Sequence, residues 1–180
     1  MNIPNQLTIL RIIMIPIFLF FLLLPTALIP VIPYHNWIAF TIFIAASLTD
    51  LFDGIIARKY NLVTNFGKFM DPLADKLMVC SALIALVELG RIPAWMVILI
   101  IFREFTISGF RLIAADNGVV IAASFWGKFK TIVQIVMVCM LIADLNILWI
   151  LTEIVTWTAI VLTVISLVDY LVKNWKVMKT

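Results

Sequence analysis

Four aspartates between positions 50 and 75 form the pattern in this sequence with the most specific chemistry. Asp50 and Asp53 are three residues apart, and Asp71 and Asp75 are four residues apart. Residues three or four apart share one face of an α-helix, so each pair would project from one side of its helix. Carboxylates grouped in this way can share protons, pair with cations or bind metal ions.

The spacing between the two pairs predicts that all four carboxylates converge. A short turn centred near Leu62 would join the two helices as an antiparallel hairpin. Asp53 and Asp71 lie equally far from this turn, and Asp50 and Asp75 lie about one helical turn further away. At about 1.5 Å per helical residue, the pairs come level roughly 10–15 Å above the turn. One pocket can therefore collect the four side chains.

The composition of this cluster favours hard divalent metal ions. Four ionised carboxylates repel one another, and the stretch holds too few bases to pair them all. Oxygen ligands without His or Cys favour Mg²⁺ or Mn²⁺ over zinc. Two such ions bridged by carboxylates would bind a diphosphate. Gly54 and Gly67, each one turn from an aspartate, would leave room for a bulky ligand, although small residues also let membrane helices pack closely.

The rest of the chain is hydrophobic enough to lie in a membrane. Of its 180 residues 64% are hydrophobic and only 13% are charged, and the mean hydropathy is +1.17. Soluble domains carry roughly a quarter charged residues. Continuous apolar runs predict an all-α integral membrane protein with one domain over residues 1–180. The six expected transmembrane helices lie near residues 7–25, 37–59, 66–89, 94–114, 119–142 and 147–172.

The basic residues predict the orientation of these helices. All but Arg91 and Arg103 of the 13 Lys and Arg residues lie nearer to one side of the predicted bundle. By the positive-inside rule, both termini, the turn at 60–65 and the carboxylate pocket face the cytoplasm. The net charge of +3 and the lack of a basic run exclude nucleic acid as an expected partner.

The run from Asp50 to Asp75 reads D-x2-D-G-x2-A-R-x8-G-x3-D-x3-D. This run resembles the signature of the CDP-alcohol phosphatidyltransferases without a departure. The resemblance implies six transmembrane helices with the active site on the cytoplasmic side. It also implies a reaction in which an alcohol displaces CMP from a CDP-linked lipid.

The resemblance implies a role for each residue of the run. The implied metal ligands are Asp50, Asp53, Asp71 and Asp75. Asp75 would also be the catalytic general base that takes the proton of the acceptor hydroxyl, because a carboxylate crowded by three others can keep a high proton affinity. The residues implied for CDP-diacylglycerol binding are Gly54, Arg58, Thr64 and Gly67.

Three looser segments extend the resemblance over the chain, toward family members whose acceptor is glycerol 3-phosphate. They are residues 2–11, 103–111 and 127–134. A dianionic acceptor needs cations near the metal pocket, and Arg111 and Lys128 are the first candidates for its phosphate. Arg103, about two turns deeper than Arg111, is the third. Two alternatives stay open: Arg111 and Lys128 would only anchor lipid headgroups, or Arg103 would be neutralised by Glu104 or by the carboxylate cluster.

The expected partners are CDP-diacylglycerol, glycerol 3-phosphate, membrane lipids and a second copy of the chain, in a bacterial cytoplasmic membrane. Asp169 and Lys173, four residues apart, are expected to pair within one helix or across a dimer contact. Rival functions are a family member with inositol phosphate or phosphatidylglycerol as acceptor, and a divalent-cation transporter. Against transport, no polar track continues from the acids to the outer face.

Overall fold

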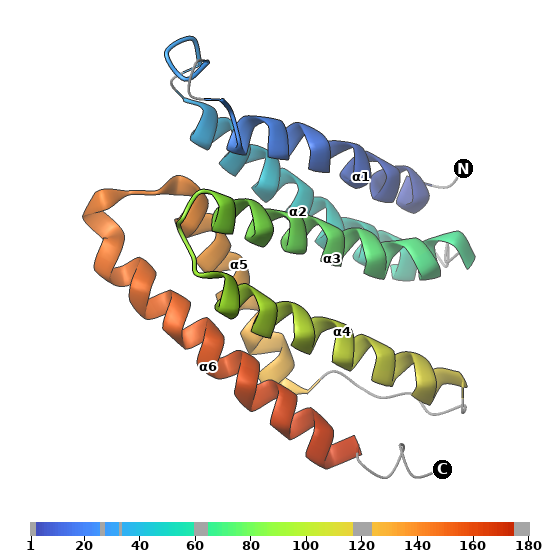
Figure 1. Ribbon diagram of the computed structural model, residues 1–180. Helices are drawn as coiled ribbons and strands as arrows, with labels where there is room; N and C mark the ends of the chain where they lie inside the picture. Colours follow the sequence, from blue (N-terminus) through green and yellow to red (C-terminus); the bar gives the residue numbers. More distant parts are fainter. Residues whose placement is uncertain (1–2, 26–27, 33, 60–64, 117–123, 175–180) are drawn as a thin grey trace. The chain divides into compact units, whose positions relative to one another are not determined.

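In the computed structural model, the residues whose structure is described form six α-helices and one short 3-10 helix (Figure 1). In chain order they are α1 (Ile3–Leu22), α2 (His35–Lys59), α3 (Asn65–Glu88), α4 (Ala94–Asp116), α5 (Phe125–Ala143), η1 (Asn146–Leu148) and α6 (Trp149–Asn174). The structure describes the backbone of residues 3–25, 28–32, 34–59, 65–116 and 124–174, and within these ranges it leaves out the side chains of residues 3–5, 50–59, 65–69, 71–72, 75 and 115–116. The described residues contain no strand. The predicted all-α class with six helices is confirmed for these residues, whereas the six membrane crossings and their orientation stay predictions.

Capping interactions explain two helix ends. The predicted fifth helix starts near residue 119, whereas α5 starts at Phe125 and residues 117–123 lie outside the described chain. Ser124 is the N-cap, because the backbone N–H of Gly127 donates to its Oγ at 3.1 Å. At the end of α3, Gly90 has a φ of 69° and its N–H donates to the Val87 carbonyl at 2.9 Å. This left-handed conformation, which glycine adopts without strain, stops the helix.

The first of two compact units contains α1, α2 and α3. It comprises residues 1–91 and 142–144, and the second unit comprises residues 92–141 and 145–180. In the first unit, α1 packs along both α2 and α3. The rings of Phe18 and Phe43 lie 5.8 Å apart, and His35 Nδ1–H donates to the Phe21 carbonyl at 3.1 Å. Phe21 follows Phe18 along α1, whereas its partner His35 precedes Phe43 along α2. The two helices are therefore antiparallel.

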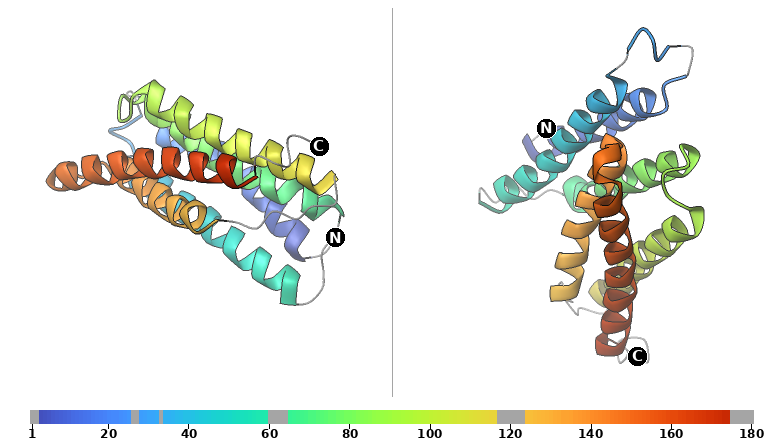
Figure 2. Two further views of the ribbon diagram at one scale, coloured as in Figure 1. Left: turned by 90° about the horizontal axis from the view of Figure 1, so that it is seen from below. Right: turned by 90° about the vertical axis from the view of Figure 1, so that its left-hand side faces the viewer.

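The second unit is organised around the contact between α4 and α6. Trp95 lies against Trp157 with ring centroids 5.9 Å apart, and Phe110 lies against Tyr170 at 6.2 Å. The later residue of α4 contacts the later residue of α6, so the two helices run parallel, as Figure 1 and Figure 2 show. Ile107 completes a buried apolar cluster with Phe110 and Tyr170.

The surfaces of α5 and α6 indicate a membrane protein. In the part of the chain that the structure describes, the helical segments Phe125–Ala143 and Asn146–Asn174 are long and apolar enough to cross a bilayer. Large apolar side chains such as Trp149, Ile154 and Val172 are exposed along α6. Soluble monomers rarely expose apolar patches of this extent, whereas lipid chains would cover them.

Arg91, in the connection between α3 and α4, joins three segments of the first unit. Its guanidinium donates to the Ile142 carbonyl at 3.1 Å and to Asn36 Oδ1 at 3.4 Å, and it lies 3.2 Å from the carboxylate of Asp144. Burial lowers the pKa of Arg91, and the Asp144 carboxylate opposes this shift. An arginine stays charged at physiological pH despite such a shift, so its three contacts persist.

We expect Arg91→Gln to lower the stability of the protein in detergent by about 1–3 kcal/mol, because a half-buried carbonyl and amide lose a charged donor. The midpoint of thermal unfolding measures this loss. Asp144→Asn is the matched control, since it removes only an ion pair whose acid is largely exposed, worth under about 1 kcal/mol. Asparagine also tolerates the φ of 49° at this position. Equal losses in the two variants would show that the ion pair, rather than the hydrogen bonds, stabilises the connection.

Candidate active site

Helices α2 and α3 carry the four predicted metal ligands. Asp53 lies six residues before the end of α2, and Asp71 lies six residues after the start of α3. Asp50 and Asp75 lie about one turn further from these ends. The two helices contact each other and run in opposite directions from a five-residue connection (Figure 1). Their backbones therefore bring the four positions to a similar height.

The side chains of these aspartates lie outside the described residues. The same holds for the predicted CDP-diacylglycerol site, which comprises Gly54, Arg58, Thr64 and Gly67. Both sites stay predictions. The donor set itself fits hard divalent cations, because it offers carboxylate oxygens from two facing helices and no imidazole or thiolate.

Arg11 on α1 is a buried cation at the same height. Its exposed fraction is 1%. Two turns separate Arg11 from Phe18 on α1, and two turns separate Phe43 from Asp50 on the antiparallel α2. Because Phe18 meets Phe43, the backbones of Arg11 and Asp50 are level. The first unit thus supplies a buried positive charge at the level where the carboxylates would repel one another.

A second polar cluster lies in the other unit, where α4, α5 and α6 each contribute side chains. Arg103 on α4 donates from Nε to Ser166 Oγ on α6 at 3.1 Å, and from Nη1 to Glu104 Oε1 at 3.1 Å. The ammonium group of Lys130 on α5 forms an ion pair with the same Glu104 oxygen. The exposed fractions are 7% for Arg103 and 1% for Lys130. Two buried cations therefore converge on one carboxylate oxygen.

The cluster includes one of the three residues predicted to bind the acceptor phosphate. Arg103 lies in it, and its expected alternative partner Glu104 does contact it. Arg111 is exposed, and its guanidinium lies 5.9 Å from the centre of the Tyr170 ring. Lys128 is exposed on α5. The acceptor roles of all three stay predictions, with Arg103 in the most desolvated position.

Lys130, like Ser166, is a member of the cluster that was not among the predicted site residues. Gly127, Lys130 and Gln134 follow one another at helical spacing, so they share one face of α5. Lys130 and Gln134 are both buried, and Gln134 Oε1 has no hydrogen-bond partner among the described groups. A polar stripe on an otherwise apolar helix is the sequence signal that distinguishes Lys130 from the exposed Lys128.

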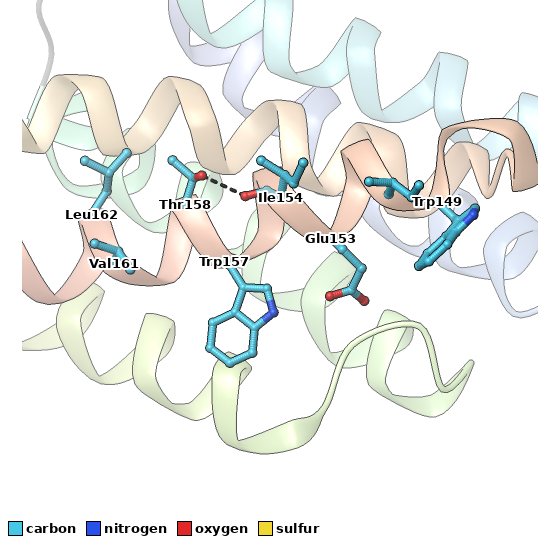
Figure 3. A pocket seen from close by; sticks show the side chains of 8 residues that line it. Trp149, Glu153, Ile154, Trp157, Thr158, Val161 and Leu162 are labelled. Carbon is cyan, nitrogen blue, oxygen red and sulfur yellow. Dashed lines mark hydrogen bonds between the residues drawn. The ribbon is translucent and has the colours of Figure 1, made fainter.

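A separate apolar hollow of about 710 Å³ lies along α6 (Figure 3). Its lining includes Trp149, Glu153, Trp157 and Val161. The lining holds a single acid and no base, so it cannot bind a diphosphate through paired carboxylates or cations. Its apolar side chains instead suit a lipid-facing surface.

Comparison with known proteins gives one family over most of the chain. The sequence profile of the CDP-alcohol phosphatidyltransferase family matches residues 1–165. This range includes parts of both compact units, the four aspartates, and Arg103, Glu104 and Lys130 of the second polar cluster.

Individual relatives from several bacteria are similar over most of their lengths. The CDP-diacylglycerol--glycerol-3-phosphate 3-phosphatidyltransferase of Bacillus subtilis (strain 168) is 46% identical, over 99% of this chain and 98% of its own length. A Mycobacterium tuberculosis (strain ATCC 25618 / H37Rv) protein named "Probable phosphatidylglycerophosphate synthase" is 41% identical, over 96% of this chain and 81% of its own. The Haemophilus influenzae CDP-diacylglycerol--glycerol-3-phosphate 3-phosphatidyltransferase is 40% identical, over 94% and 91% respectively.

Proposed function

The chain belongs to the CDP-alcohol phosphatidyltransferase family, and we propose that it transfers the phosphatidyl group of CDP-diacylglycerol to glycerol 3-phosphate. The products are phosphatidylglycerophosphate and CMP. The observation that carries this function is the 46% identity, over 99% of the chain, to a relative named for this reaction. The buried Arg103 and Lys130 support it, because an acceptor with its own phosphate needs such cations.

In the proposed reaction, Asp75 takes the proton from a hydroxyl of glycerol 3-phosphate. The hydroxyl oxygen forms a bond to the phosphorus that bears diacylglycerol, and the bond from this phosphorus to the bridging oxygen breaks. CMP leaves with that oxygen. Arg103 and Lys130, with Arg111 and Lys128 on the exposed surface, are proposed to bind the acceptor phosphate.

Asp50, Asp53, Asp71 and Asp75 would hold two divalent ions, Mg²⁺ or Mn²⁺. Bound there, such ions neutralise negative charge that develops on the diphosphate and on the departing CMP. Removal of divalent ions with EDTA is expected to stop CMP release, and excess Mg²⁺ or Mn²⁺ is expected to restore it. A CMP assay in a metal-free buffer checks this prediction. Undiminished release in EDTA would exclude the metal site.

The proposed setting is a bacterial cytoplasmic membrane, with six transmembrane helices, cytoplasmic termini and a homodimeric assembly. The alternating directions of α1 to α3 in one unit and α4 to α6 in the other support single crossings by each helix (Figure 1). In this setting the diacyl tails of the donor stay in the bilayer, while the polar site lies at headgroup depth.

The reaction can be tested by following the acceptor. The purified protein, in liposomes that contain CDP-diacylglycerol, should transfer radiolabelled glycerol 3-phosphate into the organic-solvent extract. Omission of CDP-diacylglycerol is the control. Label that stays in the aqueous phase under all conditions would contradict the proposed function.

A further inference from the structure

Glu104 occupies the position between two buried cations where an anion is best stabilised. Its Oε1 accepts from Arg103 Nη1 at 3.1 Å and also pairs with the Lys130 ammonium. The Glu104 side chain is 20% exposed, so it has access to a more solvated position, whereas Lys130 is buried. The carboxylate is therefore the member of this cluster that can leave most easily.

Arg103 is held in place by contacts other than Glu104. Its Nε donates to Ser166 Oγ at 3.1 Å, and Ser166 is fully buried on α6. Its Nη2 faces Gly127, where an added Cβ would lie only 3.3 Å away. The guanidinium would thus keep its orientation if the carboxylate moved, because Ser166 and the backbone near Gly127 still hold it.

We propose that Glu104 is a positioning residue that stands in for the acceptor phosphate. In the protein without acceptor, its carboxylate holds Arg103 and Lys130 in the arrangement that a phosphate monoester needs. The arriving phosphate, which carries close to two negative charges at pH 7, displaces this single charge. This role rests on the proposed function, because it assumes that the cluster receives glycerol 3-phosphate.

The exchange of Glu104 for phosphate affects both the binding of the acceptor and the release of the product. Phosphatidylglycerophosphate keeps the phosphate of the acceptor, so the product is bound by the same cations. The return of Glu104 to these cations competes with the product and helps to release it. An internal competitor therefore weakens acceptor binding but speeds product release.

Glu104→Gln keeps the shape of the side chain and removes its charge. Without phosphate, we expect a lower unfolding temperature than in the wild type, because two buried cations lose their anion. With inorganic phosphate or glycerol 3-phosphate, the variant should gain more stability than the wild type, with a dissociation constant lower by about tenfold. The unfolding temperature in detergent, measured at increasing concentrations of each ligand, reports both effects. Glu153→Gln, at an exposed acid on α6, is the matched control and should behave as the wild type.

Steady-state kinetics separate this role from a merely structural one. In Glu104→Gln the KM for glycerol 3-phosphate and the kcat should both fall, because acceptor and product are both held more tightly. A structural defect would raise the KM instead. Glu104→Asp, which keeps a charge on a shorter side chain, should give an intermediate phosphate affinity and remains informative if Glu104→Gln does not fold.

Two results would overturn the proposal. One is weaker or equal phosphate binding by Glu104→Gln, and the other, where that variant does not fold, is weaker phosphate binding by Glu104→Asp than by the wild type. Transfer of glycerol 3-phosphate by the wild type in the same preparation would show that the proposed function survives either result. Wild-type protein with neither phosphate binding nor transfer would overturn both.

Discussion

Asp75→Asn is expected to abolish CMP release while leaving CDP-diacylglycerol bound with near wild-type affinity. The amide has the shape of the carboxylate but cannot accept the proton of the acceptor hydroxyl. Loss of a general base costs typically 10²- to 10⁴-fold in rate. A coupled CMP assay measures the turnover, and equilibrium binding of a CDP-diacylglycerol analogue measures the affinity.

Two other Asp→Asn variants complete this test. Asp53→Asn should weaken both turnover and donor binding, because Asp53 is proposed to act only as a metal ligand and the metal ions would bind the diphosphate of the donor. Asp169→Asn is the control: its carboxylate lies 2.6 Å from Lys173 one turn away on α6, which confirms the predicted intrahelical pair. Near-normal turnover in Asp75→Asn would show that another group acts as the base.

Lys130→Met is expected to raise the KM for glycerol 3-phosphate by roughly 10- to 100-fold, since a charged hydrogen bond to phosphate contributes about 1.5–3 kcal/mol. The KM for CDP-diacylglycerol should change little, because the donor is proposed to bind along α2 and α3. Methionine fills the buried site of Lys130 with a flexible apolar side chain, and Glu104 keeps its hydrogen bond from Arg103. Initial rates at varied concentrations of each substrate separate the two effects.

Other lysines provide the comparison for this variant. Lys128→Met should have a smaller effect than Lys130→Met, because solvent screens the exposed ammonium of Lys128. Lys173→Met, at the exposed end of α6, is the control outside the proposed site. A larger loss in Lys128→Met than in Lys130→Met would move the phosphate site to the exposed face of α5.

The helices were predictable from the sequence because length and hydropathy determine which segments can lie in a bilayer. Their ends were less predictable. Ser124 caps the start of α5 through one hydrogen bond. Such a single bond is a weak signal beside the long apolar segment that predicts the helix. The Gly90 stop after α3 agrees more closely with the predicted end near residue 89.

The two polar clusters differ in how far the sequence predicts them. The four aspartates stand out because ionisable residues are costly in a span and their spacing places them on shared faces. Arg103 and Glu104 are neighbours, so their contact was foreseeable as an alternative. The polar stripe on α5 favours Lys130 over Lys128, but its contact with Glu104 depends on which face of α5 meets α4, and tertiary packing decides that.

The most direct test of the proposed function is CMP release by the purified protein from CDP-diacylglycerol with Mg²⁺, measured with three acceptors side by side. Glycerol 3-phosphate should support turnover, while inositol 1-phosphate and phosphatidylglycerol should not. Turnover with only one of the other acceptors would contradict the assigned substrate. Absence of CMP with every acceptor, together with flux of divalent ions through protein-containing liposomes, would contradict phosphatidyl transfer itself.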